Sequence, residues 1–150
     1  MKVIASIFLF LTIGCGGYKS KSGGRILDFG SFTIEAPSNW TKVKVQGIDS
    51  YVGRIAIGNT DTLEFDLGPY SNSLNENDDD QVSWAIIDGR KSKIVKQSKS
   101  GVGITGIYID SLWKNDWDVI RFNLYGMNLH PDNQRLLLKT IQTLKFFNKR

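Results

Sequence analysis

Two groups of carboxylates are the first candidates for chemistry in this chain. The segment 75–80 holds four acidic residues in six positions, and Glu76, Asp78 and Asp80 are weak candidates for oxygen ligands of a calcium ion. The spacing of an EF-hand loop is absent, because no glycine stands at its sixth position and no glutamate at its twelfth. We therefore expect an exposed loop tip without a metal site, and a calcium-dependent interaction module is the alternative.

The second group is the pair Glu64 and Asp66, which alternates with apolar residues. Side chains two apart on a strand point to the same face of a sheet, so these two carboxylates should lie side by side. A hydrolase could use such a pair for acid and base catalysis if a cleft raised the pKa of one of them. Nothing in the sequence buries them, and a solvated strand face is the simpler interpretation.

Histidine and cysteine each occur once, as His130 and Cys15, which excludes a histidine cluster and any Cys₂His₂ or Cys₄ zinc site. His130 could act as a general base toward Ser71 or Ser111, but no G-x-S-x-G or other nucleophile motif accompanies it. Because Pro131 follows, we expect His130 to mark the start of a helix. We predict no catalytic residue and no cofactor.

A run of five cations within ten residues is the main basic feature: Arg90, Lys91, Lys93, Lys96 and Lys99. On a strand Lys91 and Lys93 would share one face. A lysine-rich edge strand that blocks edge-to-edge pairing is the favoured interpretation, and a patch for anionic lipid headgroups is the alternative. Nucleic acid is not an expected partner, because no RNP-like aromatic pattern accompanies the charge.

Trp113 and Trp117 flank a predicted turn at Asn115 and Asp116. Two exposed indoles beside a turn could bind a sugar ring or a partner protein. They could equally fold back onto the core, which is the interpretation we favour. Together with Lys91 and Lys93, they are the candidate binding residues of the chain.

The N-terminus has the pattern of an export signal. After Lys2, the apolar run Val3–Ile13 has 11 residues, which is too short to span a hydrocarbon core of about 30 Å but suits a signal peptide. Leu11–Cys15 resembles the lipobox of bacterial lipoproteins. The resemblance implies cleavage before Cys15, lipidation of that residue and anchoring to the cell envelope. Gly16 stands where a retention signal would have aspartate, so we expect the periplasmic face of the outer membrane.

Length and composition then set the domain plan. The 150 residues are 41% hydrophobic and 23% charged, which is typical of one globular domain and not of a disordered or polytopic membrane protein. We expect a signal peptide at 1–14, a lipidated cysteine with a flexible glycine- and serine-rich tether at 15–24, and a single α+β domain at 25–150.

Hydrophobic alternation predicts an antiparallel β-sheet of about six to eight strands over the folded part. The predicted strands cover 32–36, 42–45, 51–57, 62–67, 84–87, 91–97, 104–110 and 119–125. The segment 104–110 has apolar residues on both faces, so it should lie centrally and be covered on each side. A polar loop is expected over 68–81. An amphipathic helix should begin at Pro131, with Leu137, Ile141 and Leu144 as its buried stripe.

Two end segments carry a family resemblance. Phe32–Trp40 is similar to the F-x-I-x-x-P-x-x-W start of Mog1/PsbP-like domains, and Leu136–Phe146 resembles their closing helix and short strand. The resemblance implies a Mog1/PsbP-like fold and an accessory or binding protein without shared catalytic residues. We therefore expect a membrane-anchored, non-enzymatic binding or accessory module of the envelope. Its expected partners are the membrane, through the lipid, and another envelope protein or an anionic envelope lipid; a hydrolase acting on envelope glycan or lipid is an alternative.

Overall fold

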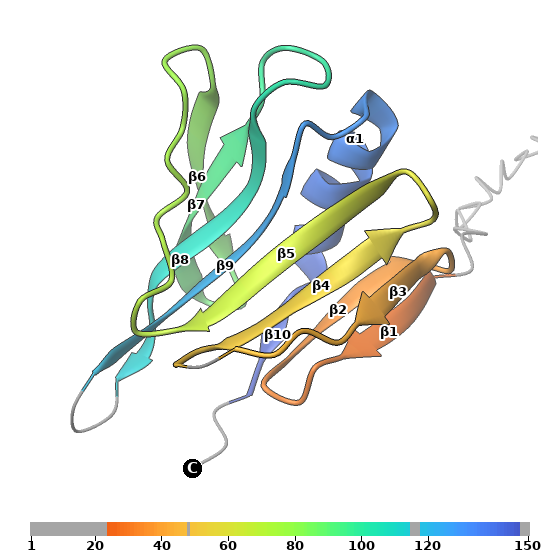
Figure 1. Cartoon of the computed structure of the whole chain (residues 1–150). Helices are drawn as coiled ribbons and strands as arrows, with labels where there is room; N and C mark the ends of the chain where they lie inside the picture. Colours follow the sequence, from red (N-terminus) through yellow and green to blue (C-terminus); the bar gives the residue numbers. More distant parts are fainter. Residues whose placement is uncertain (1–23, 48, 115–117, 148–150) are drawn as a thin grey trace, which may run out of the picture.

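The computed structural model describes residues 24–47, 49–114 and 118–147 (Figure 1). These residues form ten strands, one α-helix and one 3₁₀ turn. In chain order they are β1 (Gly24–Asp28), β2 (Phe32–Pro37), β3 (Trp40–Val43), β4 (Tyr51–Ile57), β5 (Asp61–Gly68), β6 (Gln81–Ile87), β7 (Arg90–Lys96), β8 (Ile104–Lys114), β9 (Val119–Met127), α1 (Pro131–Thr140), the 3₁₀ turn Ile141–Thr143, and β10 (Lys145–Phe146).

The strands form two antiparallel sheets. The large sheet has seven strands in the order β3-β4-β5-β9-β8-β7-β6, and the small sheet has three in the order β1-β2-β10. The predicted antiparallel sheet with a C-terminal helix is therefore confirmed, but the number of strands and the division into two sheets were not predicted. Gly24, which we expected in the tether, is the first residue of β1. Hydrophobic alternation did not predict this strand, because only Leu27 of its five residues is buried.

One hydrophobic core joins the two sheets and the helix. The small sheet and α1 cover the same face of the large sheet, which we call the inner face (Figure 1). Phe32 of the small sheet lies edge-on to Phe65 and Phe122 of the large sheet, with ring centroids 5.0 Å apart in both pairs. Leu137, Ile141 and Leu144 are fully buried there as predicted, but only Leu137 belongs to the helix: α1 ends at Thr140, Ile141 lies in the 3₁₀ turn and Leu144 follows it. None of the helices in the described part of the chain is long and apolar enough to cross a membrane.

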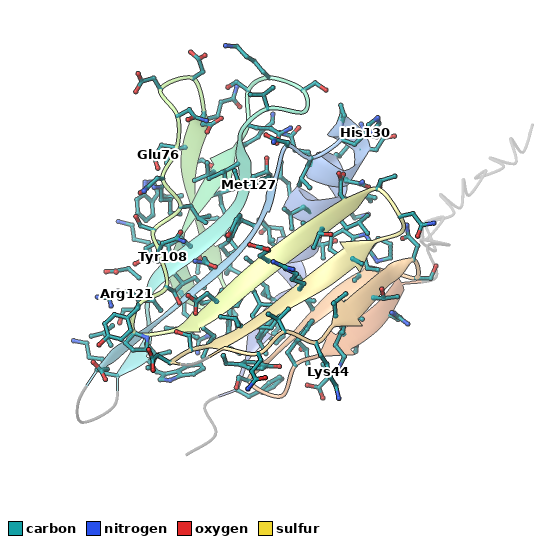
Figure 2. All side chains as sticks on the ribbon, viewed as in Figure 1. Lys44, Glu76, Tyr108, Arg121, Met127 and His130 are labelled. Atoms are coloured by element: carbon teal, nitrogen blue, oxygen red, sulfur yellow. The ribbon has the colours of Figure 1, made fainter. Side chains whose placement is uncertain are left out.

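The other face of the large sheet, which we call the outer face, is partly covered by the loop 69–80. Leu74 of this loop is 1% exposed and packs with Tyr108 and Val95. Glu76, Tyr108 and Arg121 lie along the side of the sheet where this loop runs (Figure 2). Since Ile107 of β8 lies in the main core and Tyr108 lies under the loop, the prediction that 104–110 is central and covered on each side is confirmed.

The basic strand is not at the edge of the sheet, so our favoured interpretation of the cation run was wrong. β7 pairs with β6 along seven residues and with β8 on its other side, and β6 is the edge strand. The cause is the turn at Asp88 and Gly89, whose positive φ values of 48° and 76° are typical of a two-residue hairpin turn. This turn folds β6 back outside β7, and β6 carries no charged residue.

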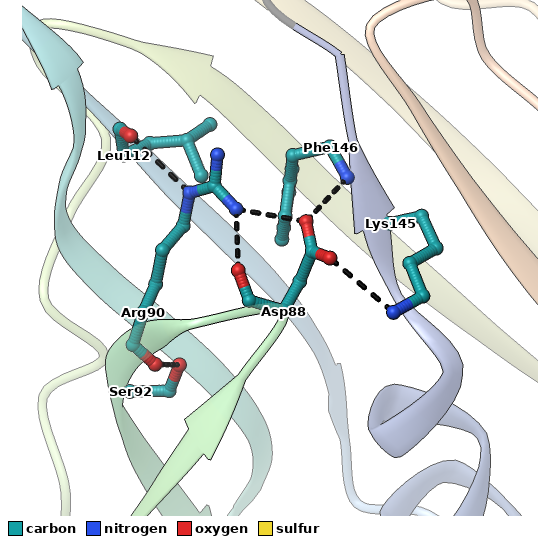
Figure 3. Close-up of polar contacts among 6 residues, drawn as sticks. All are labelled: Asp88, Arg90, Ser92, Leu112, Lys145 and Phe146. Carbon is teal, nitrogen blue, oxygen red and sulfur yellow. Dashed lines mark hydrogen bonds and ion pairs between the residues drawn. The ribbon is translucent and has the colours of Figure 1, made fainter.

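Asp88 also fastens this hairpin to the small sheet (Figure 3). Its Oδ2 accepts hydrogen bonds from the backbone N–H of Phe146, at 3.0 Å, and from the guanidinium of Arg90, at 2.8 Å. Lys145 Nζ lies 3.3 Å from the other carboxylate oxygen. Burial raises the pKa of Asp88, but these hydrogen bonds and charges outweigh it and leave the pKa below its ordinary value. Asp88 is thus a structural link between β6–β7 and β10.

Candidate functional site

The outer face carries two surface features on either side of the loop 69–80. The first, which we call the carboxylate hollow, lies over β4, β5 and β9 and includes Glu64 and Asp66. The second, which we call the β6 stripe, consists of Val82, Trp84 and Ile86. Antiparallel register places all of these side chains on one face of the sheet, since Glu64 pairs with Tyr125 on β9 and the chain of pairs continues strand by strand to β6.

The carboxylate hollow has a volume of about 210 Å³. Two rows of cross-strand neighbours make its floor: Arg54, Glu64 and Tyr125 form one row, and Val52, Asp66 and Asn123 form the other. Val45, which follows β3, and Asn72 of the loop complete the lining. The two predicted carboxylates therefore do share one concave surface.

Glu64 is held by two neighbours within the hollow. Arg54 Nε lies 2.8 Å from Glu64 Oε1, and the Tyr125 hydroxyl donates to Oε2 at 3.0 Å. Burial and the neighbouring carboxylate of Glu64 raise the pKa of Tyr125 to about 12. The phenol therefore stays protonated at neutral pH and donates its hydrogen bond to Glu64.

Asp66 is in a different position. Its Oδ1 is buried and has no hydrogen-bond partner among the described residues, and its carboxylate forms no ion pair there. Its backbone, in contrast, is fixed: the N–H donates to Asn123 Oδ1 at 3.1 Å, and the carbonyl accepts from Ser71 at 3.0 Å. Asp66 is therefore the carboxylate of the hollow that the described residues leave without a counter-ion.

The loop 69–80 is attached to the sheet by polar contacts from Asn123 and Lys93. Asn123, which is fully buried, donates from Nδ2 to the carbonyl of Asn72 at 3.0 Å. Lys93 Nζ donates to the carbonyls of Ser73 and Leu74, both at 3.1 Å, and contacts Glu76 Oε2 at 2.5 Å. The hydrogen bond from Lys93 lowers the pKa of Glu76. These contacts fix the loop between the hollow and the β6 stripe.

The β6 stripe is the largest group of neighbouring apolar side chains left exposed on one described strand. Val82 is 43% exposed, Trp84 61% and Ile86 68%. Lys91, on the adjacent strand, lies with its Nζ 4.6 Å from the centroid of the Trp84 ring. The other side of β6 has no strand paired to it in the described structure, so its backbone donors and acceptors are open at the sheet edge.

The predicted binding residues are divided between these features and the interior. Lys91 is exposed beside the β6 stripe, whereas the side chain of Lys93 is only 13% exposed and its ammonium is used by the loop. Trp113 is half-buried and packs against the main core, as we favoured. Trp117 and Cys15 lie outside the described residues.

The acidic segment does not gather its carboxylates at one point. Glu76 faces Lys93, Asp79 is paired with Lys99 at 2.7 Å, and Asp80 accepts a hydrogen bond from the backbone of Asn77. Asp78 is exposed beside them. Across the described ranges, no group of three or more His, Cys, Asp or Glu residues could hold a metal ion.

His130 is exposed and immediately precedes α1, with Pro131 at the first helical position as predicted. Its backbone N–H donates to Asp61 Oδ2 at 3.1 Å. The Ser71 hydroxyl donates to backbone carbonyls, including that of Asp66, and Ser111 is exposed on β8. These hydrogen bonds of His130 and Ser71 thus stabilise the helix start and the loop, and none of them joins the two residues.

A larger hollow of about 610 Å³ lies between the small sheet and α1, and its lining includes Arg25, Glu35 and Thr143. Two of its polar groups are used by the fold: the Arg25 guanidinium donates to the carbonyl of Trp40, and the Thr143 hydroxyl accepts from the backbone N–H of Glu35 at 2.9 Å. We therefore place the candidate site on the outer face.

Sequence reasoning missed the partners that complete both features. Tyr125 and Asn123 come from β9, with Tyr125 61 residues from Glu64, so only the register of the sheet reveals them. Arg54 lies ten residues from Glu64, on the other strand of the β4–β5 hairpin. The alternation of Val82, Trp84 and Ile86 was visible in the sequence, but their exposure follows from the position of β6 at the edge.

No protein-family model matches the sequence, and no curated protein matches it at a significant level.

Proposed function

We propose that this chain is a lipid-anchored periplasmic module of the bacterial cell envelope that binds another envelope component and catalyses no reaction. Two features support the proposal. The segment Leu11–Cys15 resembles a lipobox, and the folded part exposes the β6 stripe on an open sheet edge. The outer membrane is the proposed site of attachment, because Gly16 follows the cysteine.

The β6 stripe is the observation that carries the binding role. An exposed, uncharged edge strand is a template for association, and soluble proteins usually block such edges with charge or proline. Here none of the seven residues of β6 is charged or proline. Trp84 also offers a large, rigid contact surface of the kind that dominates protein interfaces.

The position of the stripe favours a protein over the bilayer as its partner. β6 and β1 lie at opposite sides of the molecule (Figure 1). The lipid anchor would be attached upstream of Gly24, the first residue of β1. A stripe on the far side from the anchor is suited to a component that approaches from the periplasm. An anionic envelope lipid near Lys91 is the second possible partner.

The family resemblance supports the same role. Phe32 and Ile34 of the quoted motif are buried in β2, Pro37 ends that strand and Trp40 is fully buried at the start of β3. The closing motif forms α1 and the short strand β10. We propose on this basis that the domain is Mog1/PsbP-like, a family of accessory and binding domains without shared catalytic residues.

The anchor is tested by replacing its attachment point. In a host that processes lipoproteins, the chain with Cys15 should incorporate radiolabelled palmitate and sediment with outer membranes. Cys15→Ser should lose the label and remain soluble or unprocessed. Unlabelled wild-type protein, or mature protein that still carries residues 1–14, would contradict the anchor.

The binding surface is tested with a matched pair of positions. Ile86 on β6 is 68% exposed and Ile26 on β1 is 66% exposed, so the two differ in location but hardly in accessibility. A photo-crosslinking amino acid at position 86 should give a discrete adduct with one envelope protein in living cells, whereas position 26 should not. Equal adducts at both positions, or none at position 86, would contradict the proposed surface.

A carboxylate hydrolase is the second candidate, because Glu64 and Asp66 line one hollow. Against it, both oxygens of Glu64 already accept hydrogen bonds, and the two acids project from one strand instead of facing each other across a substrate. Release of products from purified peptidoglycan or phospholipid, lost in Glu64→Gln, would support this candidate. A calcium-dependent module, the third possibility, would require a lower melting temperature after chelation.

A further inference from the structure

We propose that the carboxylate hollow binds a primary ammonium group, with Asp66 as its counter-ion. This inference is independent of the lipid anchor and of the β6 stripe, because the hollow lies on the other side of the loop 69–80. It rests on two observations: the Asp66 carboxylate of the hollow has no counter-ion among the described residues, and the groups beside it can still accept hydrogen bonds.

The charge balance of the hollow calls for a cation. Arg54 and Glu64 neutralise each other through two N–O contacts of 2.8 Å. Asp66 is the remaining ionisable carboxylate of the lining, and no cation among the described residues pairs with it. Its Oδ1 is shielded from solvent and lacks a donor, which is costly for a charged oxygen. Because Oδ1 is closed to solvent, a bound cation would donate its hydrogen bonds to the other oxygen, Oδ2, and would neutralise the charge that the two oxygens share.

The hydrogen-bonding capacity of the neighbours points the same way. The proton of the Tyr125 hydroxyl is used on Glu64, so the phenolic oxygen has lone pairs left to accept with. One side-chain N–H of Asn123 donates to the carbonyl of Asn72, and its amide oxygen accepts from the backbone N–H of Asp66. The acceptors left beside Asp66 are thus its own carboxylate and the phenolic oxygen, and a ligand that carries only donors can use both. An ammonium group carries three donors and no acceptor, which matches this supply.

The size and lining of the hollow favour an alkyl ammonium over a metal ion. The described residues contain no group of three acidic, histidine or cysteine ligands, whereas calcium takes six to eight oxygens. Val45 and Val52 line the hollow beside the polar groups and could contact a methylene chain. At about 210 Å³ the hollow suits the end of a short amine. The amine could be a free diamine or the lysine side chain of another protein.

The test uses the full chain, purified from membranes in detergent and labelled with ¹⁵N. Titration with n-butylamine should shift the backbone amide of Asp66 and the side-chain amide of Asn123, and n-butanol at the same concentrations should not. Asp66→Asn keeps the shape and removes the charge, so it should weaken amine binding at least tenfold. Asp110→Asn is the matched control, because Asp110 lies on the same face but is paired with Arg121 outside the hollow, and it should leave binding unchanged.

Other results would overturn the proposal. Equal binding of butylamine by Asp66→Asn, or shifts of the same resonances by butanol, would show that Asp66 is not a counter-ion for ammonium. Stronger displacement by calcium than by the amine would also contradict it. Should Asp66→Asn fail to fold, Tyr125→Phe provides the second variant, with a weakening of at least threefold expected. Putrescine and Nα-acetyl-lysinamide then distinguish the sources: tighter binding of the first supports a free diamine, and of the second a protein lysine.

Discussion

Asp88 shows how a single side chain can link two sheets. It occupies a turn position with φ of +48°, which aspartate and asparagine tolerate better than other non-glycine residues. Asp88→Asn keeps this backbone but removes the charge that Arg90 and Lys145 contact. Hydrogen bonds to charged groups contribute about 1.5–3 kcal/mol, and asparagine retains part of this, so we expect a loss of about 1–2 kcal/mol in urea unfolding at pH 7.

The effect of Asp88 should depend on pH in a defined direction. The folded state holds its pKa below the ordinary value of 3.8, so its contribution is fully present above that value and disappears as the pH falls through the folded pKa. Wild type and Asp88→Asn should therefore converge in stability under acidic conditions. Asp79→Asn is the control, because the Asp79–Lys99 pair is exposed and should change stability by less than about 0.5 kcal/mol. A difference that does not shrink as the pH falls below 3.8 would contradict this role.

Two tyrosines of the outer face should titrate late. Burial raises the pKa of both Tyr125 and Tyr108 to about 12, helped by hydrogen bonds to Glu64 and Asp110. The folded state then keeps protons that the unfolded state releases near pH 10, so stability should fall as the pH rises from 10 to 12. Absorbance at 295 nm should show a late phase that Tyr125→Phe and Tyr108→Phe each reduce. One step near pH 10 for all tyrosines would contradict this.

Among the elements, the loop 69–80 depends on one apolar side chain. Leu74 is 1% exposed, although its φ of 56° is unfavourable for leucine. Leu74→Ala should cost about 2–3 kcal/mol in the local opening of the loop. Hydrogen exchange should therefore speed up in the loop while α1 keeps its protection. Asn75→Ala, at the exposed neighbouring position, should leave both unchanged, and equal loss of protection in α1 would contradict a local effect.

The elements differ in how far the sequence determines them. The strand 51–57 and the helix beginning at Pro131 were predicted correctly, because apolar spacing and proline act within a few residues. β10 has only two residues and exists through its pairing with β2, so hydrophobic alternation did not indicate it, and only the family resemblance implied a short closing strand. The same limit holds for the site. Period-two alternation placed Glu64 and Asp66 on one face, but Tyr125 comes beside them through the pairing of β5 with the distant strand β9.

The identity of the edge strand was the main error, and it is also non-local. The cations of β7 suggested a protected edge, yet the partner that covers β7 is decided by the turn at Asp88 and Gly89. The Lys93 ammonium therefore binds Ser73 and Glu76 of the loop 69–80, and its side chain is only 13% exposed. Exposure of Trp84 and Ile86 follows from the same turn. Which strand lies at the edge of the sheet could thus not be predicted from the composition of β7 alone.

For the whole molecule, the shared core implies that the two sheets unfold together. Phe32 of the small sheet is 0% exposed and contacts Phe65 and Phe122 of the large sheet. Phe32→Ala should cost about 3–5 kcal/mol. Because the lost contacts join both sheets, circular dichroism and tryptophan fluorescence should report one coincident transition at a lower urea concentration.

The matched control is Ile26→Ala, on β1 of the small sheet. Ile26 is 66% exposed, so this variant should change stability by less than about 0.5 kcal/mol. Trp40, which is fully buried between the sheets, makes fluorescence sensitive to their separation. If Phe32→Ala gave two separate transitions, with the tryptophan signal changing before the strand signal, the small sheet would be an independent unit. A single shifted transition instead means that Asp88, Phe32 and α1 stabilise one cooperative body, on which the hollow and the β6 stripe are held at fixed positions.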